Sequence, residues 1–512
     1  MTLLTKSDLL SIRQCKRKLW LDYHQPLTEN GRRDRRAVDG ELVNAAARAQ
    51  LGDVYWPSGG EDKIAAAQMA FVGLAANPDK PAVEMPLVFD GVYVRIDALL
   101  PSPKGYLVVE TKASSFPLKK DKLTPGTPDA HHIDDIAIQT WALHGTGIAY
   151  GGSFLNLLDG QWRYPGAGDY SGLFRRYDVT DIVASVASSE VPRWVEEAKK
   201  TISAGMPDVK TGTQCEKPHP CPHKAFCATL EEPPNPNTVM VLPGNGGKAL
   251  ARKLLGMGFE DLTVVPPERI SGSDTQLFLR IQEAHKTGKP VFDEVGAKAE
   301  MGTFPYPRSC FDFEAIDLAI PKWKGVRPYE QITFQWSCHV ERSPGVFEHF
   351  EFLDLSGDDP SIACIESLLA VFERFDGPIF VYYLTYEESR LRELALRHPE
   401  YADRLEAVIS RLVDLLPITK RYFYSADMLG SFSIKSVLPC VSSISYEDLD
   451  EVADGTAAQV AYMNAALDPR CSAARKSELR GKLLTYCKQD TLAMVLVAHF
   501  LEGKTAGTSI SL

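Results

Sequence analysis

The sequence predicts a mixed α/β protein with two domains. The chain of 512 residues is too long to be buried around a single hydrophobic core. Strand-like stretches such as GVYVRIDALLP and ITFQWSCHV occur among helical ones such as GGKALARKLLGM. The proline-rich run EEPPNPN, which begins at residue 231, indicates a break. We therefore expect domains at residues 1–230 and 306–512, with a helical linker region at residues 231–305.

The composition is that of an ordinary globular protein, with 44% hydrophobic and 24% charged residues. No apolar run approaches the length of a membrane span and the first twenty residues lack a signal-peptide core, so we expect a cytoplasmic location. The net charge is −11, yet residues 1–36 hold nine Lys or Arg against four Asp or Glu. This basic stretch could meet phosphate groups, but a solvated helix face explains it more simply, so charge decides nothing.

A phosphate-binding loop is excluded at the glycine-rich run GNGGKA, residues 244–249. The first glycine of that motif would fall on Leu242, and Ala249 replaces the hydroxyl that binds magnesium. We therefore do not expect an ATPase.

Two neighbouring strand-like segments carry polar residues that interrupt an apolar pattern. The first, GVYVRIDALLP, alternates as a strand and has Asp97 on its polar face. The second, YLVVETKAS, puts Glu110 and Lys112 on one face. Two carboxylates can hold Mg²⁺ or Mn²⁺ through oxygen, and a lysine can orient water or stabilise developing charge. The pattern therefore predicts a hydrolytic metal site.

A helical segment, DDIAIQTWAL, follows these strands and places Gln139 on a helix. This order of Asp, Glu-x-Lys and helical Gln resembles the PD-(D/E)XK nucleases, and within them the RecB-like branch. The resemblance implies a restriction-endonuclease-like fold for residues 1–230. It also implies that Asp97 and Glu110 are metal ligands, that Lys112 is catalytic and that Gln139 assists the site.

The chain departs from this family at two positions. The family often has a tyrosine four residues after the glutamine, where this sequence has Leu143. It also often has a metal-binding histidine on an early helix, where this sequence has Asn44. The ligand from that helix is therefore open, and Glu41 or Glu84 could contribute instead.

Four cysteines surround the nuclease motifs. Three lie in CEKPHPCPHKAFC, and the fourth lies about two hundred residues upstream in SIRQCKRKLWL. By count, four thiolates fit a zinc ion or a [4Fe–4S] cluster equally well, and His219 and His223 keep zinc open. The split spacing resembles that of the iron–sulfur RecB-like nucleases, which include the CRISPR-adaptation nuclease family. The resemblance implies a [4Fe–4S] cluster held by Cys15, Cys215, Cys221 and Cys227.

Such a cluster would join the ends of a segment of about 210 residues. In the cross-linking treatment of chain entropy, a closure of this length stabilises the folded state by about 4–5 kcal/mol. We therefore expect a structural staple and not a redox centre.

A second set of acidic residues lies in the C-terminal part. The strand-like CFDFEAIDL puts Asp312 and Glu314 on one face. The apolar helix LLTYCKQDTLAMVLV has Tyr486 and Asp490 four residues apart, hence on the same side. An Asp-x-Glu pair, a middle acid and a late Tyr-x-x-x-Asp resemble the DEDD exonucleases, which have ribonuclease-H-like folds.

The resemblance implies two metal ions held by four carboxylates, with Tyr486 positioning the attacking water. The middle acid is Glu387 in FVYYLTYEESRLREL, and Asp414 in LVDLLPI is the alternative. Where the family has an asparagine, this sequence has Tyr383. The implied metal ligands are Asp312, Glu314, Glu387 and Asp490.

As a whole the chain resembles a bacterial family that fuses a RecB-like nuclease to a ribonuclease-H-like domain. RPYEQITFQWSCH and GSFSIKSVLP are the stretches that carry this resemblance beyond the motifs. It implies phosphodiester hydrolysis with Mg²⁺ or Mn²⁺, on DNA more than RNA, with exonuclease action at the second site. A helicase or defence-system partner would fit, and a membrane is not expected. The alternatives are a nucleic-acid-binding scaffold with decayed sites and an RNA-processing nuclease.

Overall fold

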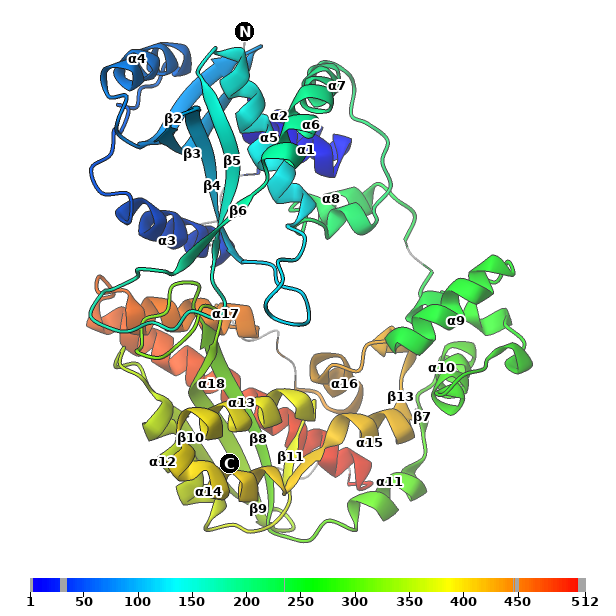
Figure 1. Cartoon of the computed structure of the whole chain (residues 1–512). Helices are drawn as coiled ribbons and strands as arrows, with labels where there is room; N and C mark the ends of the chain where they lie inside the picture. The colour runs from blue at the N-terminus through cyan, green and yellow to red at the C-terminus, as the bar shows by residue number, and fades with distance from the viewer. Residues whose placement is uncertain (1–2, 28–34, 234, 445, 447–450, 505–512) are drawn as a thin grey trace. The chain divides into compact units, whose positions relative to one another are not determined.

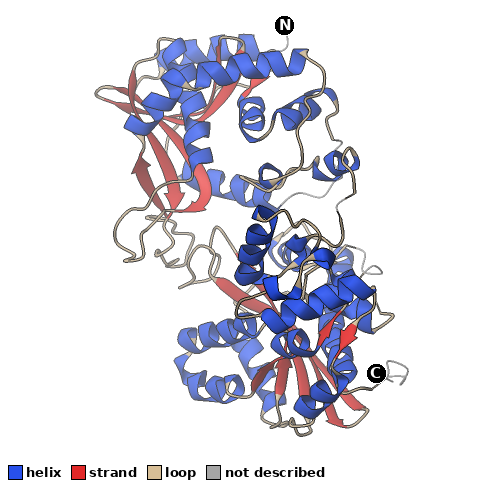
Figure 2. Ribbon diagram, turned by 90° about the vertical axis from the view of Figure 1, so that its right-hand side faces the viewer, coloured by secondary structure: helices blue, strands red, loops and turns tan. Residues whose placement is uncertain are grey.

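A computed structural model describes residues 3–27, 35–233, 235–444, 446 and 451–504. The chain forms two compact units. Unit 1 comprises Met1–Pro233 and Leu318–Glu330, and unit 2 comprises Pro234–Asp317 and Gln331–Leu512. Both units combine helices with a mixed sheet (Figure 1 and Figure 2), which confirms the predicted α/β class.

Unit 1 contains a six-stranded sheet in the order β1-β3-β4-β5-β6, with β2 also paired to β3. The β1–β3 and β4–β5 pairs are parallel, and the β2–β3, β3–β4 and β5–β6 pairs are antiparallel. The strands are β1 (Leu4–Thr5), β2 (Ala82–Phe89), β3 (Val92–Ser102), β4 (Gly105–Ser115), β5 (Tyr150–Leu158) and β6 (Phe174–Asp178). Alternating burial along β3 matches the alternation of its sequence.

The helix α5 (Ala130–Gly145) makes the crossover that the parallel β4–β5 pair requires. Its apolar residues, among them Ile136 and Ala142, pack against the sheet in the main core of unit 1 (Figure 1). The other helices are α1 (Lys6–Gln14), α2 (Lys16–His24), α3 (Arg35–Ala49), α4 (Lys63–Ala76), α6 (Thr180–Ser189), α7 (Val191–Ser203) and α8 (Lys224–Thr229). The short α1 begins with a capping box in which Thr5 and Asp8 exchange hydrogen bonds, so the turn from β1 into α1 is well defined.

A segment from the second half of the chain belongs to unit 1. Residues 318–330 directly follow β8 (Arg308–Asp317) in sequence, yet Ala319 is buried with Val43, Leu158 and Leu173. The hydroxyl of Tyr329 donates a hydrogen bond of 2.6 Å to the carbonyl of Ala113. The boundaries expected from sequence placed this whole segment in the C-terminal domain, because Pro321, Gly325 and Pro328 suit a loop within one domain equally well.

Unit 2 contains a five-stranded sheet in the order β10-β9-β8-β11-β12. The β10–β9 and β9–β8 pairs are antiparallel, and the β8–β11 and β11–β12 pairs are parallel. The strands are β8 (Arg308–Asp317), β9 (Gln331–Ser343), β10 (Val346–Leu353), β11 (Ile379–Val381) and β12 (Leu412–Asp414). The strands β8 and β9 occupy the strand-like stretches CFDFEAIDL and ITFQWSCHV, whereas the three-residue β12 carries too little pattern to be recognised.

The helices of unit 2 surround this sheet, and α18 (Ala473–Leu501) packs on β8 and β9. The others are α9 (Gly244–Gly256), α10 (Thr275–Thr287), α11 (Glu294–Met301), α12 (Ser361–Phe372), α13 (Leu384–Arg397), α14 (Ala402–Ile409), α15 (Leu415–Tyr422), α16 (Ile434–Val441) and α17 (Gly455–Tyr462). Two short strands, β7 (Val291–Phe292) and β13 (Phe423–Tyr424), form a separate antiparallel pair.

Much of the expected linker region is part of unit 2. Phe278 and Ile281 on α10 and Met301 on α11 are buried in one core with Met494 and Leu501 on α18. Residues 235–305 therefore contribute to the hydrophobic core, because their helices have apolar faces that α18 and α15 cover.

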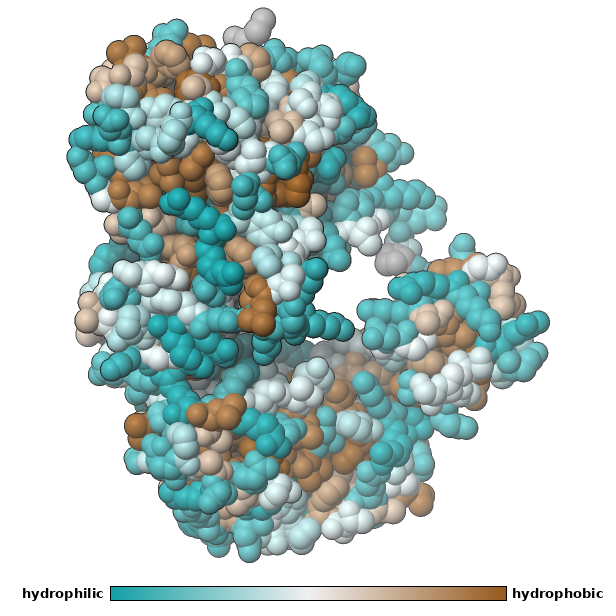
Figure 3. All heavy atoms as spheres, viewed as in Figure 1, coloured by the Kyte–Doolittle hydropathy of each residue, from teal (hydrophilic) through white to brown (hydrophobic). Residues whose placement is uncertain are grey.

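Among the helices that the structure describes, none is both long and apolar enough to cross a bilayer. The face seen in Figure 3 is mostly hydrophilic or intermediate in colour, with small brown groups spread among the teal.

Candidate metal sites

The first predicted site forms where β3 and β4 pair. Ala98 lies opposite Val109 in the antiparallel register, which brings Asp97 next to Glu110. The carboxylate of Asp97 accepts the backbone N–H of Thr111 at 3.1 Å. The Lys112 ammonium lies 2.6 Å from Glu110 Oε1. The expectation that the two strands present these side chains together is met.

The helix α5 adds Gln139, which is fully buried. Its side-chain amide donates hydrogen bonds to Glu110 Oε2 at 2.7 Å and to Asp135 Oδ1 at 3.0 Å. Its Oε1 atom is buried and has no hydrogen-bond partner among the residues that the structure describes. A buried acceptor without a donor is costly, so this position suits an additional ligand or ordered water.

Two further charged residues belong to this cluster and were not predicted. Asp135 pairs with Lys112 and lies 2.7 Å from the ammonium of Lys6. Lys6 also approaches Glu110 Oε1 at 3.3 Å. Asp135 lies four residues before Gln139, so helical spacing could have placed it on the same face. Lys6 has no such signal, because only the pairing of β1 with β3 brings it here.

The electrostatics of this site are dominated by burial. Burial, together with repulsion from Glu110, raises the pKa of Asp97 to about 8. Burial also opposes the charged forms of Lys112 and Asp135. Attraction to Glu110 and Asp135 nevertheless raises the pKa of Lys112, and attraction to Lys6 and Lys112 lowers the pKa of Asp135. The site therefore holds three carboxyl groups against two firmly charged lysines.

The alternative ligands lie in other settings. The carboxylate of Glu84 pairs with Arg48 and Arg95, each at 2.7 Å. Glu41 is exposed on α3, where Asn44 is half-buried. Leu143, which stands where the family often has tyrosine, is fully buried in the core.

The basic N-terminal stretch is largely engaged within unit 1. Arg32 and Arg33 lie outside the described residues. Six of its other basic side chains form ion pairs with acids of unit 1: Lys6 with Asp135, Arg13 with Asp134, Lys16 with Glu197, Arg17 with Asp208, Lys18 with Asp22 and Arg35 with Asp39. These pairs support the simpler interpretation that this stretch is not a phosphate-binding arm.

The four predicted cluster cysteines all lie in unit 1 as free thiols. The side chain of Gln14, next to Cys15, donates to the carbonyls of Gln214 at 2.8 Å and His219 at 2.7 Å. Packing thus brings Cys15 to the segment that holds Cys215, Cys221 and Cys227, across some two hundred residues of sequence. Burial raises the pKa of the Cys221 thiol, and the neighbouring Cys215 and Cys227 raise it further. His223 is buried, and its ring bonds to Asp22 at 2.8 Å.

The second predicted site forms on the central strand of unit 2. Asp312 and Glu314 from β8 and Asp490 from α18 bring carboxylate oxygens within 4.8 Å of one another. In the described part of the chain this is one of two groups of three or more His, Cys, Asp or Glu side chains whose ligand atoms lie so close. The other group, in unit 1, is described below.

The structure distinguishes the two candidates for the middle acid. Glu387 is buried in the first turn of α13, and its charge repels that of Asp312 and adds to the rise that burial causes in the pKa of Asp312. Its Oε2 atom is buried without a hydrogen-bond partner among the described residues. Asp414 instead caps α15 and accepts the backbone N–H of Leu384 at 3.0 Å. Glu387 therefore belongs to the carboxylate group, and Asp414 supports the helix that carries it.

A cavity of about 490 Å³ opens beside these carboxylates. Its lining includes Tyr486 and one basic residue among those described, Lys435. The Lys435 ammonium lies 5.0 Å from the ring centre of Tyr446 and 5.2 Å from that of Tyr486. The Tyr446 hydroxyl donates a hydrogen bond of 2.6 Å to Asp490 Oδ1. Lys435 and Tyr446 were not identified from sequence, because nothing in the local pattern places either beside the carboxylates, although Lys435 lies in the stretch GSFSIKSVLP.

Burial and mutual repulsion make this group reluctant to ionise. Burial raises the pKa of Asp312 and of Glu314 well above the usual range, and Asp490 raises both further. Burial raises the pKa of Glu387 to about 8. Lys435 opposes this trend by attraction to Glu314 and Asp490. Clustered acids with so little compensating charge are the donor set that a hard divalent cation requires.

Comparison with known proteins gives limited information. No curated protein matches the chain. A solved structure titled "Crystal structure of SSO0001" is similar at 13% sequence identity and a TM-score of 0.24, over 46% of this chain and 87% of that chain. This likeness is too weak to support an argument about the fold. Residues 309–433, which carry Asp312, Glu314 and Glu387, match a family described as "Domain of unknown function (DUF2779)".

Proposed function

We propose that this protein is a metal-dependent nuclease that hydrolyses phosphodiester bonds, with DNA as its main substrate. The proposal rests above all on the gathering of Asp312, Glu314 and Asp490 beside an open cavity, with Glu387 close enough to repel Asp312. Unit 2 is on this proposal a ribonuclease-H-like exonuclease domain, and unit 1 a PD-(D/E)XK domain of the RecB-like branch.

The residues of the second site fit Mg²⁺ or Mn²⁺. Buried carboxylates that repel one another, and an Oε2 atom of Glu387 without a partner among the described residues, match a group of oxygen ligands for such ions. Bound there, the metal would polarise the phosphate and make water a better nucleophile. The four carboxylates hold the metal, and the cavity admits the substrate.

Two other side chains act directly in this site on our proposal. Burial and repulsion from Asp490 raise the pKa of Tyr486, so its hydroxyl stays protonated at neutral pH. Tyr486 can therefore position a water molecule by hydrogen bonding but cannot serve as the base. Lys435 offers the positive charge that can meet a phosphate oxygen in the cavity.

The first site also suits metal-dependent hydrolysis, but its carboxylates lie beside two lysines, Lys6 and Lys112. Asp97 and Glu110 hold the metal, and Gln139 Oε1 provides a further oxygen, which is buried without a partner among the described residues. Lys112 lies between Glu110 and Asp135, where it can orient water or stabilise developing charge. Gln139 keeps Glu110 in position through its hydrogen bond.

We also propose that Cys15, Cys215, Cys221 and Cys227 hold a [4Fe–4S] cluster. The contacts of Gln14 with the cysteine segment support this assignment, because they bring the two cysteine-bearing stretches together. The cluster would act as a staple within unit 1 and take no part in hydrolysis.

The test is hydrolysis of end-labelled single- and double-stranded DNA and RNA by the purified protein, with Mg²⁺, Mn²⁺ or EDTA. Degradation should require metal, and Asp312→Asn and Asp97→Asn should each remove a distinct activity. Asp403→Asn, on the exposed surface of α14, is the matched control and should behave as wild type. Degradation of RNA alone would favour an RNA-processing nuclease. Binding of DNA without metal-dependent cleavage would mean that the protein is a binding scaffold.

A further inference from the structure

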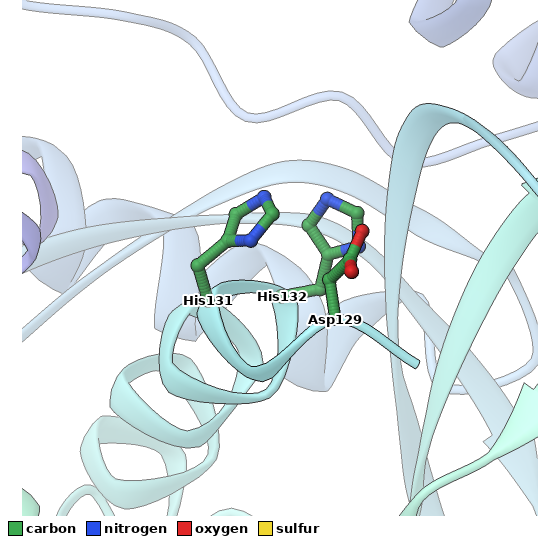
Figure 4. Close-up of side chains that lie close together, drawn as sticks. All are labelled: Asp129, His131 and His132. Carbon is green, nitrogen blue, oxygen red and sulfur yellow. The ribbon is translucent and has the colours of Figure 1, made fainter. Parts of the chain in front are cut away.

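A second group of possible metal ligands lies in unit 1, where the chain enters α5. Asp129, His131 and His132 bring carboxylate oxygen and imidazole nitrogen atoms within 4.8 Å of one another. Figure 4 shows the three side chains on the same side of the first helical turn, with the Asp129 carboxylate beside the His132 ring. None of these residues belongs to the sites described above.

The two imidazole rings of His131 and His132 lie close together at the start of α5. Their ring centroids are only 4.0 Å apart, and His132 is buried. Within the described part of the chain, neither ring forms a hydrogen bond to another side chain or to the backbone. Histidine nitrogens are common metal ligands, so nitrogens without such partners are available to bind an ion. The arrangement therefore favours a ligand between the rings.

A third imidazole faces this group from the cysteine segment. The ring centroid of His219 lies 5.2 Å from that of His131, at an interplanar angle of 82°. Two imidazoles on one tetrahedral zinc ion, with Zn–N distances of roughly 2.0–2.1 Å, have ring centroids roughly 5 Å apart, so His131 and His132, at 4.0 Å, must separate by about 1 Å when they share an ion. His219 is thus at a suitable distance to complete a four-ligand set.

We propose that Asp129, His131 and His132 bind one divalent transition-metal ion, represented by Zn²⁺, with His219 as the fourth ligand. Nitrogen ligands favour such an ion over Mg²⁺, which prefers oxygen. The site therefore differs in metal preference from the two carboxylate groups. The ion joins the start of α5 to the segment between Cys215 and Cys221, and α5 also carries Asp135 and Gln139.

The test compares zinc binding by the full-length wild type with that by His131→Ala and by His131→Ala/His132→Ala. After equilibration with Zn²⁺ and removal of loosely bound metal, the wild type should retain one more zinc per chain than the double variant. His144→Ala, at the other end of α5, is the matched control and should lose no zinc. In the Cys221→Ala background, adding His131→Ala/His132→Ala should again remove one zinc per chain, because no cysteine belongs to this site.

Two further measurements sharpen the test. The apparent affinity, measured by competition with a chromophoric chelator, should fall at least about a hundredfold in His131→Ala, more than loss of a supporting outer partner usually costs. It should fall about tenfold in His219→Ala, and an unchanged affinity would overturn the fourth-ligand assignment. The zinc lost in the double variant should show nitrogen or oxygen neighbours at roughly 2.0–2.1 Å and no sulfur at roughly 2.3 Å by X-ray absorption.

Equal zinc content in wild type and double variant, or a sulfur shell in the lost zinc, would overturn the proposal. His131 is only partly buried, so His131→Ala should fold normally as judged by circular dichroism. That single variant decides the question if the double variant does not fold, and unchanged affinity in it would refute the site.

Discussion

The carboxylate of Asp414 accepts a hydrogen bond of 3.0 Å from the backbone N–H of Tyr383. Tyr383 has a φ of 82°, a left-handed conformation that a bulky residue adopts only when its surroundings hold it there. The contact fixes the start of α13, where Glu387 lies in the first turn. A residue outside the carboxylate group thus determines where one of its members is placed.

Asp414→Ala should lower stability by about 1–2 kcal/mol, because it removes the cap of α15 and the acceptor at the start of α13. It should also reduce the activity that depends on Asp312, since Glu387 loses its support. Asp414→Asn retains a side-chain oxygen that can accept these hydrogen bonds. This variant should keep most of the stability and most of the activity. Denaturant unfolding and nuclease rates measure the two effects. Equal losses in both variants would show that Asp414 acts through its charge.

Asp312→Asn should stabilise the metal-free protein at alkaline pH while it abolishes the second activity. A carboxyl group whose pKa is raised by folding stabilises the folded state below its ordinary pKa, and this contribution is lost as pH rises through the raised value. For Glu387 that window runs from about 4.5 to about 8. The repulsion therefore grows as the pH rises through this window, and at pH 8 removing one charge should contribute about 1 kcal/mol or a rise in Tm of about 2–4 °C.

Thermal unfolding in EDTA at pH 5 and pH 8 measures this difference. The advantage of the variant should vanish at pH 5, where the group is protonated, and should shrink at pH 8 when Mg²⁺ is added. A variant that is equally stable or less stable than wild type at pH 8 in EDTA would contradict the repulsion inferred from burial.

Lys112→Ala should destabilise unit 1 as well as abolish its activity. The substitution leaves Glu110 and Asp135 with Lys6 as their remaining charged partner in the cluster. Removing one partner of a buried ion pair typically costs about 3–5 kcal/mol. Lys16→Ala, which breaks a pair with Glu197 on the exposed surface, should cost less than about 1 kcal/mol. Chemical denaturation of both variants provides the comparison, and similar costs would mean that the inner pair is well solvated.

Lys435→Gln should move the acidic limb of the pH–activity profile of the second site to higher pH. Lys435 lowers the pKa of Glu314 and Asp490 by attraction, so its removal raises both and delays their ionisation. Because only ionised carboxylates bind the metal well, activity at neutral pH should fall and should recover partly with more Mg²⁺. Lys298→Gln, exposed on α11, is the control. If the acidic limb of kcat/KM against pH does not shift, Lys435 does not control the ionisation of Glu314 and Asp490.

Cys221→Ala should remove the brown colour of anaerobically purified protein and destabilise unit 1, leaving unit 2 folded. Iron and sulfide should each approach four per chain in the wild type. Cys471→Ala is the control, because Cys471 lies in unit 2 outside the proposed ligand set. Zinc without iron at the cysteines would replace the cluster with a zinc staple.

Local sequence pattern predicted those parts of the fold and sites whose partners are near in sequence. Alternation located β3, β4 and β8, and their polar positions identified Asp97, Glu110 and Asp312. The positions of Lys6, Lys435 and Tyr446 depend on contacts between distant segments, which no periodicity records. The choice between Glu387 and Asp414 also required the structure, since the sequence shows neither the burial of Glu387 nor the capping of α15 by Asp414. The roles of all these residues stay predictions.

The return of residues 318–330 to unit 1 has a consequence for inheritance. The polypeptide passes between the units three times, near residues 233, 317 and 330, so neither unit is encoded by one continuous stretch of gene. A recombination event at the proline-rich junction would separate Val43, Leu158 and Leu173 from the Ala319 segment that covers them. The exposed apolar surface would favour aggregation of the fragment. We therefore expect recombination to keep the gene segments for the two units together.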